Sequence, residues 1–167
     1  MNAIVIRNAR IWDGDGGDSF PGTVLIEGAR IAAVAPGAND PAAESALEID
    51  AAGKFLMPGM IDGHSHLTFD DIHAGPDLGA IPPEEHTLIT MHNARKLLEA
   101  GFTGAYGAAS AKIRLDVVVR NEIEAGRIPG PRLRAASPEI TVTAGLGDAD
   151  LLHISHDSFG LVANGTD

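Results

Sequence analysis

Hydrophobic positions in the first fifty residues come in short runs, separated by turns that are rich in glycine and aspartate. The runs are Ala3–Arg7, Thr23–Glu27, Ile31–Ala35 and the segment around Ala46–Ile49. Between the first two runs, Asp13–Asp18 is dense in residues that tolerate positive φ angles. This pattern predicts closely spaced strands in a small antiparallel sheet or sandwich, which needs a second layer to bury its apolar face.

A different pattern begins at Lys54. Phe55–Leu67 starts as a near-continuous apolar run, which is typical of a parallel strand covered on both faces. Helical spacing follows, and Pro82 and Pro83 are suited to open a helix that Gly101 ends. Spacings of three and four residues predict that the buried stripe of this helix comprises Leu88, Met91, Arg95 and Leu98.

Strand and helix then alternate along the chain. Thr103–Tyr106 is predicted as a strand, and Ser110–Ala125 as a helix with its first residue as the N-cap. Leu133–Ala136 and Ile140–Val142 are predicted as further strands. This rhythm favours a parallel α/β sheet or barrel.

Charge and composition exclude several classes of partner. Lys and Arg number 12 and Asp and Glu number 23, so the formal net charge is −11. This balance argues against duplex nucleic acid or an anionic membrane, because both attract clustered basic residues. No secretory signal opens the chain, and no segment approaches the roughly 18 apolar residues of a membrane span. We therefore expect an acidic cytoplasmic protein that binds neither nucleic acid nor membrane.

The sharpest local feature is the sequence Asp62–Gly63–His64–Ser65–His66. Side chains alternate along a strand, so His64 and His66 are expected to point the same way. Two neutral imidazoles in that arrangement can share one divalent cation, at about 2.0–2.1 Å from each nitrogen for zinc. Asp62 is expected on the same face, where it supports a ligand or the metal. The chain has no cysteine, so a metal must be held by histidines and carboxylates.

The residues around this motif resemble a known family. Phe55–Leu67 is similar to the segment that opens the catalytic barrel in the amidohydrolase superfamily, with an apolar run, Pro-Gly, an apolar pair and then Asp-x-His-x-His. In this chain Pro58–Gly59, Asp62, His64 and His66 stand in register with that pattern. Lys96–Thr103 resembles the passage from helix to strand that follows the metal strand in this superfamily. Asn121–Ala136 and Ile140–Asp148 resemble its imidazolonepropionase-like and dipeptidase-like branch.

The resemblance implies a metal-dependent hydrolase with a (β/α)8 TIM-type barrel preceded by a small β-sandwich domain. Residues 1–54 would form part of the sandwich, and residues 55–167 the first strands and helices of the barrel. In such enzymes the two histidines of the first strand bind the more buried metal, so His64 and His66 are the predicted ligands of one or two divalent ions, with zinc preferred. Later strands supply a lysine or acidic bridge, two more histidines and an aspartate.

The length of the chain does not suffice for the whole barrel. A barrel of this type takes about 250 residues, and the chain after Lys54 offers about three of its eight strands. An open piece of this kind would expose strand edges and apolar surface. We therefore expect a C-terminal remainder, as a second chain or a missing segment, to complete the enzyme, and a homo-oligomer once it is complete.

Several further residues are candidates for contact with a small-molecule substrate. Tyr106 stands where relatives of this branch often carry Arg-Asp, and its hydroxyl is predicted to reach the pocket, with simple packing as the alternative. His73 lies in the loop after the metal strand. His153 lies in a later loop, where a solvated loop with incidental histidines is the alternative. His86 and His92 are expected on the surface of the first helix.

The predicted activity is hydrolysis of an amide-type C–N bond, in a cyclic amide, small amide or dipeptide, through a metal-activated water. An ester, lactone or phosphoester is the alternative substrate, because the same metal site does not specify its electrophile. A non-catalytic role, as the scaffold half of a split barrel, is the alternative from a different class of function.

Overall fold

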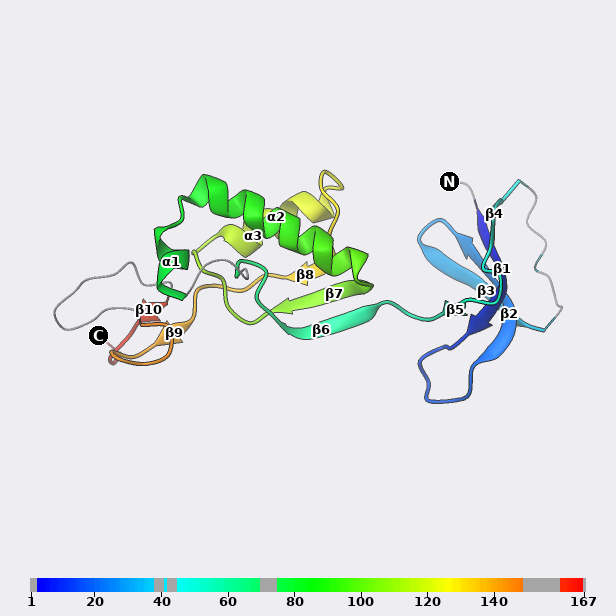
Figure 1. The fold of residues 1–167 in the computed structure, drawn as a ribbon, viewed down its shortest axis with the longest axis horizontal. Coiled ribbons are helices and arrows are strands. Elements are labelled where there is room, and N and C mark those ends of the chain that lie inside the picture. The colour runs from blue at the N-terminus through cyan, green and yellow to red at the C-terminus, as the bar shows by residue number, and fades with distance from the viewer. Residues whose placement is uncertain (1–2, 38–40, 42–44, 70–74, 149–159, 167) are drawn as a thin grey trace. The chain divides into compact units, whose positions relative to one another are not determined.

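The computed structural model describes residues 3–37, 41, 45–69, 75–148 and 160–166. The chain divides into two compact units, Met1–Pro58 and Gly59–Asp167 (Figure 1). No helix in the described ranges is both long enough and apolar enough to cross a membrane.

The first unit is a single mixed sheet. Its strands are β1 (Ile4–Ile11), β2 (Phe20–Glu27), β3 (Arg30–Pro36), β4 (Leu47–Asp50) and β5 (Phe55–Leu56). The order is β3-β2-β1-β4, and β5 also pairs with β1. Hairpins join the first three strands as predicted, and the turn between β2 and β3 uses Gly28 at a φ of 62°, where a side chain is disfavoured.

The expected antiparallel pairing holds for β1, β2 and β3, but β4 and β5 both run parallel to β1. The connection from β3 to β4 is longer than a hairpin turn, and this allows the chain to return to β1 in the same direction. The hydrophobic cluster on one side of the sheet is centred on the buried residues Ala9, Ile11 and Val24. The described residues of this unit form one layer and include no second layer of a sandwich.

The predicted domain boundary after Lys54 differs from the division in the structure. Phe55 and Leu56 form β5, which pairs with Arg10 and Ile11 of β1, so the first unit continues to Pro58. An apolar run does not reveal which of two sheets it joins, and the predicted strand over Phe55–Leu67 is in fact two strands, β5 and β6.

The second unit alternates strands and helices. Its elements are β6 (Met60–Ser65), α1 (Gly75–Ala80), α2 (Pro83–Glu99), β7 (Phe102–Gly107), α3 (Leu115–Glu124), β8 (Arg132–Arg134), β9 (Ile140–Thr141) and β10 (Leu161–Val162). The strands β6, β7 and β8 are adjacent and parallel, and β9 and β10 form a separate parallel pair. Figure 1 shows α2 and α3 over the same face of the β6-β7-β8 sheet. This arrangement is the repeating unit of a parallel α/β barrel.

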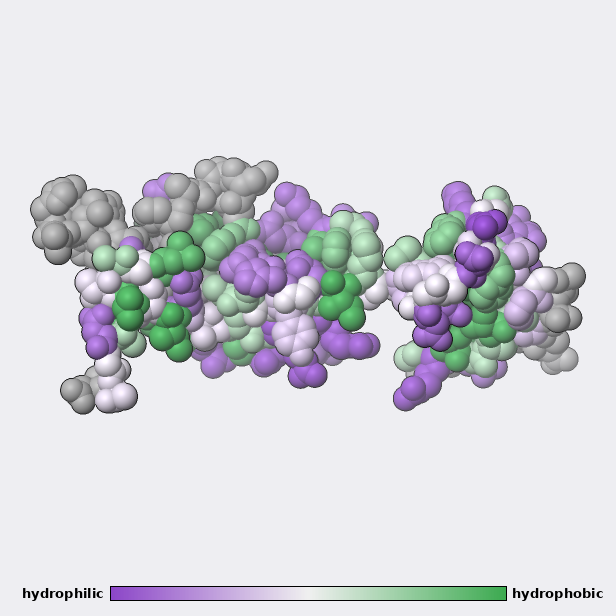
Figure 2. Space-filling model, turned by 90° about the horizontal axis from the view of Figure 1, so that it is seen from below, coloured by the Kyte–Doolittle hydropathy of each residue, from purple (hydrophilic) through white to green (hydrophobic). Residues whose placement is uncertain are grey.

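The core of the second unit lies between these two helices and the sheet. It contains Leu67, Ala94, Ala105, Val119 and Leu133. Because Ala105 and Leu133 point toward the helices, the alternate residues of their strands face the other way. That opposite face is open: Ile61 is 72% exposed and Tyr106 is 56% exposed. Figure 2 likewise shows apolar residues open to the surface on both units.

The bounds of α2 match the prediction, but its predicted buried stripe is only partly right: Met91 is half-buried against the core, whereas Arg95 is exposed. Leu88 is 65% exposed, and the buried positions are His86, Thr90 and Ala94. These three residues follow four-residue spacing, and the small Thr90 and Ala94 allow the helix to lie close to the sheet. The helix ends as expected: Gly101, at a φ of 95°, donates its N–H to the carbonyl of Leu98.

The start of α3 also differs from the prediction. The helix begins at Leu115, after an N-cap residue, Arg114, whose side chain makes no capping hydrogen bond. Ser110 is not the N-cap; its hydroxyl donates to the carbonyl of Lys112, which stabilises a turn before the helix.

Candidate metal centre

His64 and His66 lie at the carboxyl end of β6. This end of a parallel α/β barrel carries the active site in such folds. The pairing between β6 and β7 shifts register between Asp62 and Ser65, so strict alternation does not hold across Gly63. Ser65 is buried, and its carbonyl accepts a hydrogen bond from Ala108 beyond the end of β7. The strand is therefore anchored between the two histidines.

The two imidazole rings turn their Nε2 atoms toward each other. The atoms are 3.2 Å apart, and the ring centroids lie 5.0 Å apart in an edge-on arrangement. Two nitrogens at that separation, each about 2.0–2.1 Å from one ion, would subtend an angle of about 100° at it, close to the tetrahedral angle that zinc adopts in proteins. The donor set and its spacing therefore fit a shared divalent cation.

Asp62 contacts the backbone of the first of the two histidines. Its Oδ1 accepts a hydrogen bond of 3.0 Å from the backbone N–H of His64, and its side chain lines a groove beside Lys96 and Leu97 of α2. The carboxylate thus holds the backbone of a predicted ligand. Across the part of the chain that the structure describes, no group of three or more histidine or acidic side chains is placed to hold a metal.

Of the other predicted substrate contacts, the structure describes Tyr106. Tyr106, on β7, lines a shallow groove on the open face of the sheet with Ile61 and Arg134. His73 and His153 lie outside the described residues. His92 is exposed on α2 as expected.

The expectation that His86 lies on the surface is wrong. His86 is completely buried, and its Nε2 lies 2.7 Å from the carbonyl oxygen of Thr68. Thr68 is also buried, and its hydroxyl accepts the N–H of Ala111. His86 therefore connects α2 to the turn that follows β6. The sequence did contain one indication of this burial: His86 lies four residues before Thr90 and eight before Ala94, and so on the same face of the helix.

The turn after His66 is held by two more residues. Phe69 stacks on the His66 ring, with centroids 4.6 Å apart and planes 20° apart, and its N–H donates to the His66 carbonyl. Asn93 of α2 donates from Nδ2 to the carbonyls of both Leu67 and Phe69, at 3.0 and 2.9 Å. One side chain on α2 thus fixes the backbone on both sides of Thr68, and with it the ring that stacks on His66.

We expect Asn93→Ala to loosen this turn. The carbonyls of Leu67 and Phe69 both lose their donor, and leaving a buried acceptor unpaired lowers the free energy of unfolding by about 1–3 kcal/mol. Metal affinity is expected to fall roughly tenfold, because His66 loses part of its support. Competition with a coloured chelator measures the affinity. His92→Ala, one residue away on the exposed side of α2, is the control; equal affinities in the two variants would contradict the role of Asn93.

One buried acid near the histidines was missed from the sequence. Asp116, in the first turn of α3, is completely buried, and its Oδ2 accepts the N–H of Ala136 at 3.1 Å. Burial raises the pKa of this carboxyl, while the Ala136 N–H, the Ser110 hydroxyl and the nearby His66 act to lower that pKa. Its position next to Leu115 and three residues before Val119, inside the apolar stripe of the helix, was the signal for its burial.

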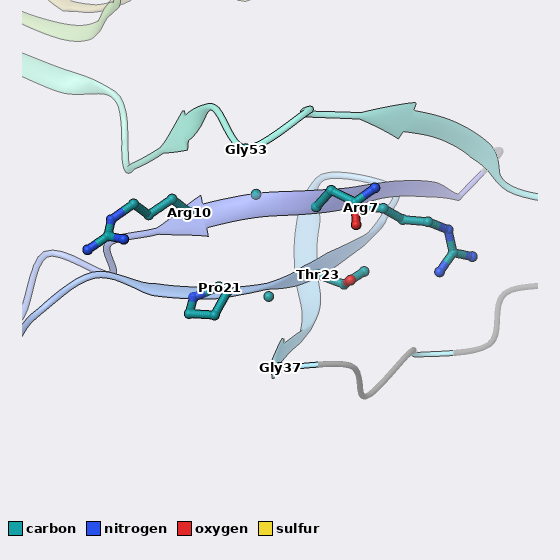
Figure 3. Close-up of a pocket in the computed structure, with 9 residues that line it drawn as sticks. Arg7, Arg10, Pro21, Thr23, Gly37 and Gly53 are labelled. Carbon is teal, nitrogen blue, oxygen red and sulfur yellow. The ribbon is translucent and has the colours of Figure 1, made fainter.

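A second concave surface lies on the first unit. Arg7 and Arg10 of β1 and Pro21 and Thr23 of β2 border it (Figure 3). None of the described residues that line it is a histidine or an acid. It therefore offers no ligands of the kind that a metal requires in this cysteine-free chain.

Comparison with known proteins agrees with the fold. Residues 55–159 match the amidohydrolase family. The chain is 31% identical over 104 residues to an adenine deaminase of Rubrobacter xylanophilus, and 48% identical over 46 residues to an imidazolonepropionase of Arthrobacter sp.. These alignments cover 62% and 28% of this chain, and 14% and 11% of the two relatives.

A solved structure extends the likeness to nearly the whole chain. The crystal structure of an amidohydrolase superposes with a TM-score of 0.83 at 27% identity, covering 98% of this chain and 41% of the other. The predicted fold class, the start of a (β/α)8 barrel preceded by a β domain, is thereby confirmed. The chain spans well under half the length of these relatives. Members of this family are hydrolytic enzymes that generally bind divalent metals. On the match over residues 55–159, the chain belongs to the amidohydrolase family.

Proposed function

We propose that this chain supplies the first two metal ligands, and the first strands of the barrel, to a zinc-dependent hydrolase of amide-type C–N bonds. The observation that carries the proposal is the convergence of His64 Nε2 and His66 Nε2 to 3.2 Å at the carboxyl end of β6. The remaining ligands would come from a segment outside this chain, either later in a longer polypeptide or in a second one.

The chemistry expected at this centre follows from its ligands. A divalent cation held there supplies Lewis acidity, which polarises a carbonyl and makes water reactive near neutral pH. The chain's own residues position this chemistry: Asp62 fixes the backbone of His64, while Asn93 and Phe69 fix the turn and ring of His66. Both Nε2 atoms are thereby kept pointing at one place.

The substrate class is argued from the relatives and from the site. Relatives with names such as adenine deaminase, imidazolonepropionase and L-hydantoinase act on C–N bonds. Tyr106 and the two arginines Arg132 and Arg134 lie on the open face of the sheet, which turns inward when such a barrel closes. These polar groups favour a small, polar substrate, such as a cyclic amide or a dipeptide.

Metal analysis combined with a substrate panel tests the proposal. The native protein, with any polypeptide that co-purifies, should retain one or two equivalents of zinc per completed barrel after dialysis. Chelation should abolish hydrolysis of cyclic amides and dipeptides, and added zinc should restore it. If the protein hydrolysed only esters, lactones or phosphoesters, the proposed amide substrate would be wrong, and the hydrolysed class would take its place. No metal under any condition would indicate a non-catalytic scaffold instead.

A further inference from the structure

Two buried polar atoms near the carboxyl end of the sheet have no hydrogen-bond partner among the residues that the structure describes. They are His66 Nδ1 and Asp116 Oδ1. A buried polar atom without a partner lowers the stability of the folded state, so such atoms are rare in folded proteins. One of these atoms can donate and the other can accept, and the two residues interact electrostatically.

Asp116 contacts the ends of two neighbouring strands. Its Oδ2 accepts the N–H of Ala136, just beyond β8. A Cβ added at Gly107, the last residue of β7, would lie 2.6 Å from the same Oδ2. The carboxylate therefore lies against the end of the central strand, and it has that room because residue 107 is glycine. His66 directly follows β6, which pairs with β7 on the side opposite to β8.

The tautomer of the His66 ring determines whether its Nδ1 needs a hydrogen-bond acceptor or a donor. When Nε2 gives its lone pair to a metal, the proton of the neutral ring is on Nδ1 and needs an acceptor. A backbone carbonyl or a carboxylate fills this role in most metal sites with histidine ligands. Asp116 Oδ1 is a buried acceptor with that capacity still unused.

We propose that Asp116 is a positioning residue for His66, and that its Oδ1 accepts the Nδ1–H of His66 when Nε2 binds the metal. The hydrogen bond fixes the tautomer that leaves the Nε2 lone pair available, and it fixes the ring toward His64. This inference rests on the proposed function, because it takes His66 as a ligand. It adds a specific residue on α3, outside the metal strand, to the centre.

An asparagine at position 116 is expected to reverse the tautomer. The Ala136 N–H will hold the amide oxygen in the place of Oδ2, because the amide NH2 cannot accept this hydrogen bond. The NH2 group is then left in the place of Oδ1, where it donates to His66 Nδ1. The ring must consequently carry its proton on Nε2, the atom that the metal requires.

The experiment compares Asp116→Asn and Asp116→Ala with the unchanged protein. The 15N chemical shifts of both His66 ring nitrogens report the tautomer in the metal-free protein, and His66→Gln assigns the signals. Chelator competition reports zinc affinity. Glu84→Gln, which removes an exposed acid from the first turn of α2, is the control for general loss of charge at a helix start.

We expect Nδ1–H in the unchanged protein and in Glu84→Gln, and Nε2–H in Asp116→Asn. Zinc affinity is expected to fall 10- to 100-fold in both Asp116 variants, the usual loss on removing such a partner. Asp116→Asn keeps the side-chain volume and the Ala136 contact, so it tests the proposal even if Asp116→Ala does not fold. An unchanged tautomer and affinity in Asp116→Asn would overturn it. If the variant with both His64 and His66 replaced by alanine still bound zinc, the proposed function itself would be overturned.

Discussion

Replacing His64 and His66 together with alanine is expected to abolish specific zinc binding by the native protein. The Nε2 atoms of the two imidazoles lie 3.2 Å apart, and the described residues include no group of three or more histidines or acids that could hold a metal elsewhere. Without them, a metal ion would keep only the ligands that come from outside this chain, and these would not hold it. Zinc retained after dialysis, measured by elemental analysis, should fall from one or two equivalents to background.

The control for this change is His92→Ala, on the exposed side of α2. It removes an imidazole that lies outside the centre, and zinc content should stay unchanged. The double variant should keep its helical circular dichroism, because His64 is exposed and neither ring belongs to the apolar core. Undiminished zinc in a folded double variant would contradict the ligand assignment.

The second large effect is expected for Leu133→Ala. Leu133 is 3% exposed on β8 and lies in the core with Ala105 and Val119. Truncation removes buried apolar contacts and leaves a cavity, so the free energy of unfolding should fall by about 2–5 kcal/mol. Chemical denaturation followed by helical circular dichroism reports this loss, since the described helices all lie in the second unit.

Leu88→Ala is the matched control for Leu133→Ala. It removes the same side chain from a position that is 65% exposed, where the expected change is within about 0.5 kcal/mol. This comparison also tests the corrected buried face of α2. A loss of unfolding free energy in Leu88→Ala as large as that in Leu133→Ala would contradict the exposed position of Leu88 on α2.

Local patterns were sufficient to predict most elements of the fold. The start of α2 at Pro83, its end before Gly101 and the strand that follows all depend on residues close in sequence. Strand partners depend on distant residues, which explains why the parallel pairing of β4 and β5 with β1 was not foreseen. An apolar run carries no information about which sheet it will join.

Burial on helices was predicted less well, for a related reason. Hydrophobicity favoured Leu88 as a core residue, but close approach of α2 to the sheet favours Thr90 and Ala94. His86 and Asp116 were missed because a polar side chain becomes a core residue only when specific partners meet it, here the Thr68 carbonyl and the Ala136 N–H. Such partners lie 18 and 20 positions away in the sequence.

Of the candidate site, the pair His64 and His66 was predicted from spacing along one strand, and the structure brings the two rings together. Asp62 acts on the backbone of His64, and the register shift after Asp62 interrupts the alternation that was assumed for the residues that follow. Alternation along a strand assumes regular pairing, and a bulge cannot be seen in a pattern of six residues.

The most direct test of the central claim is a zinc-edge anomalous diffraction measurement on crystals of the zinc-loaded native protein. The expected result is one anomalous peak between the two rings, with His64 Nε2 and His66 Nε2 each about 2.0–2.1 Å from it. A peak bound elsewhere, with these two rings turned apart, would contradict the account.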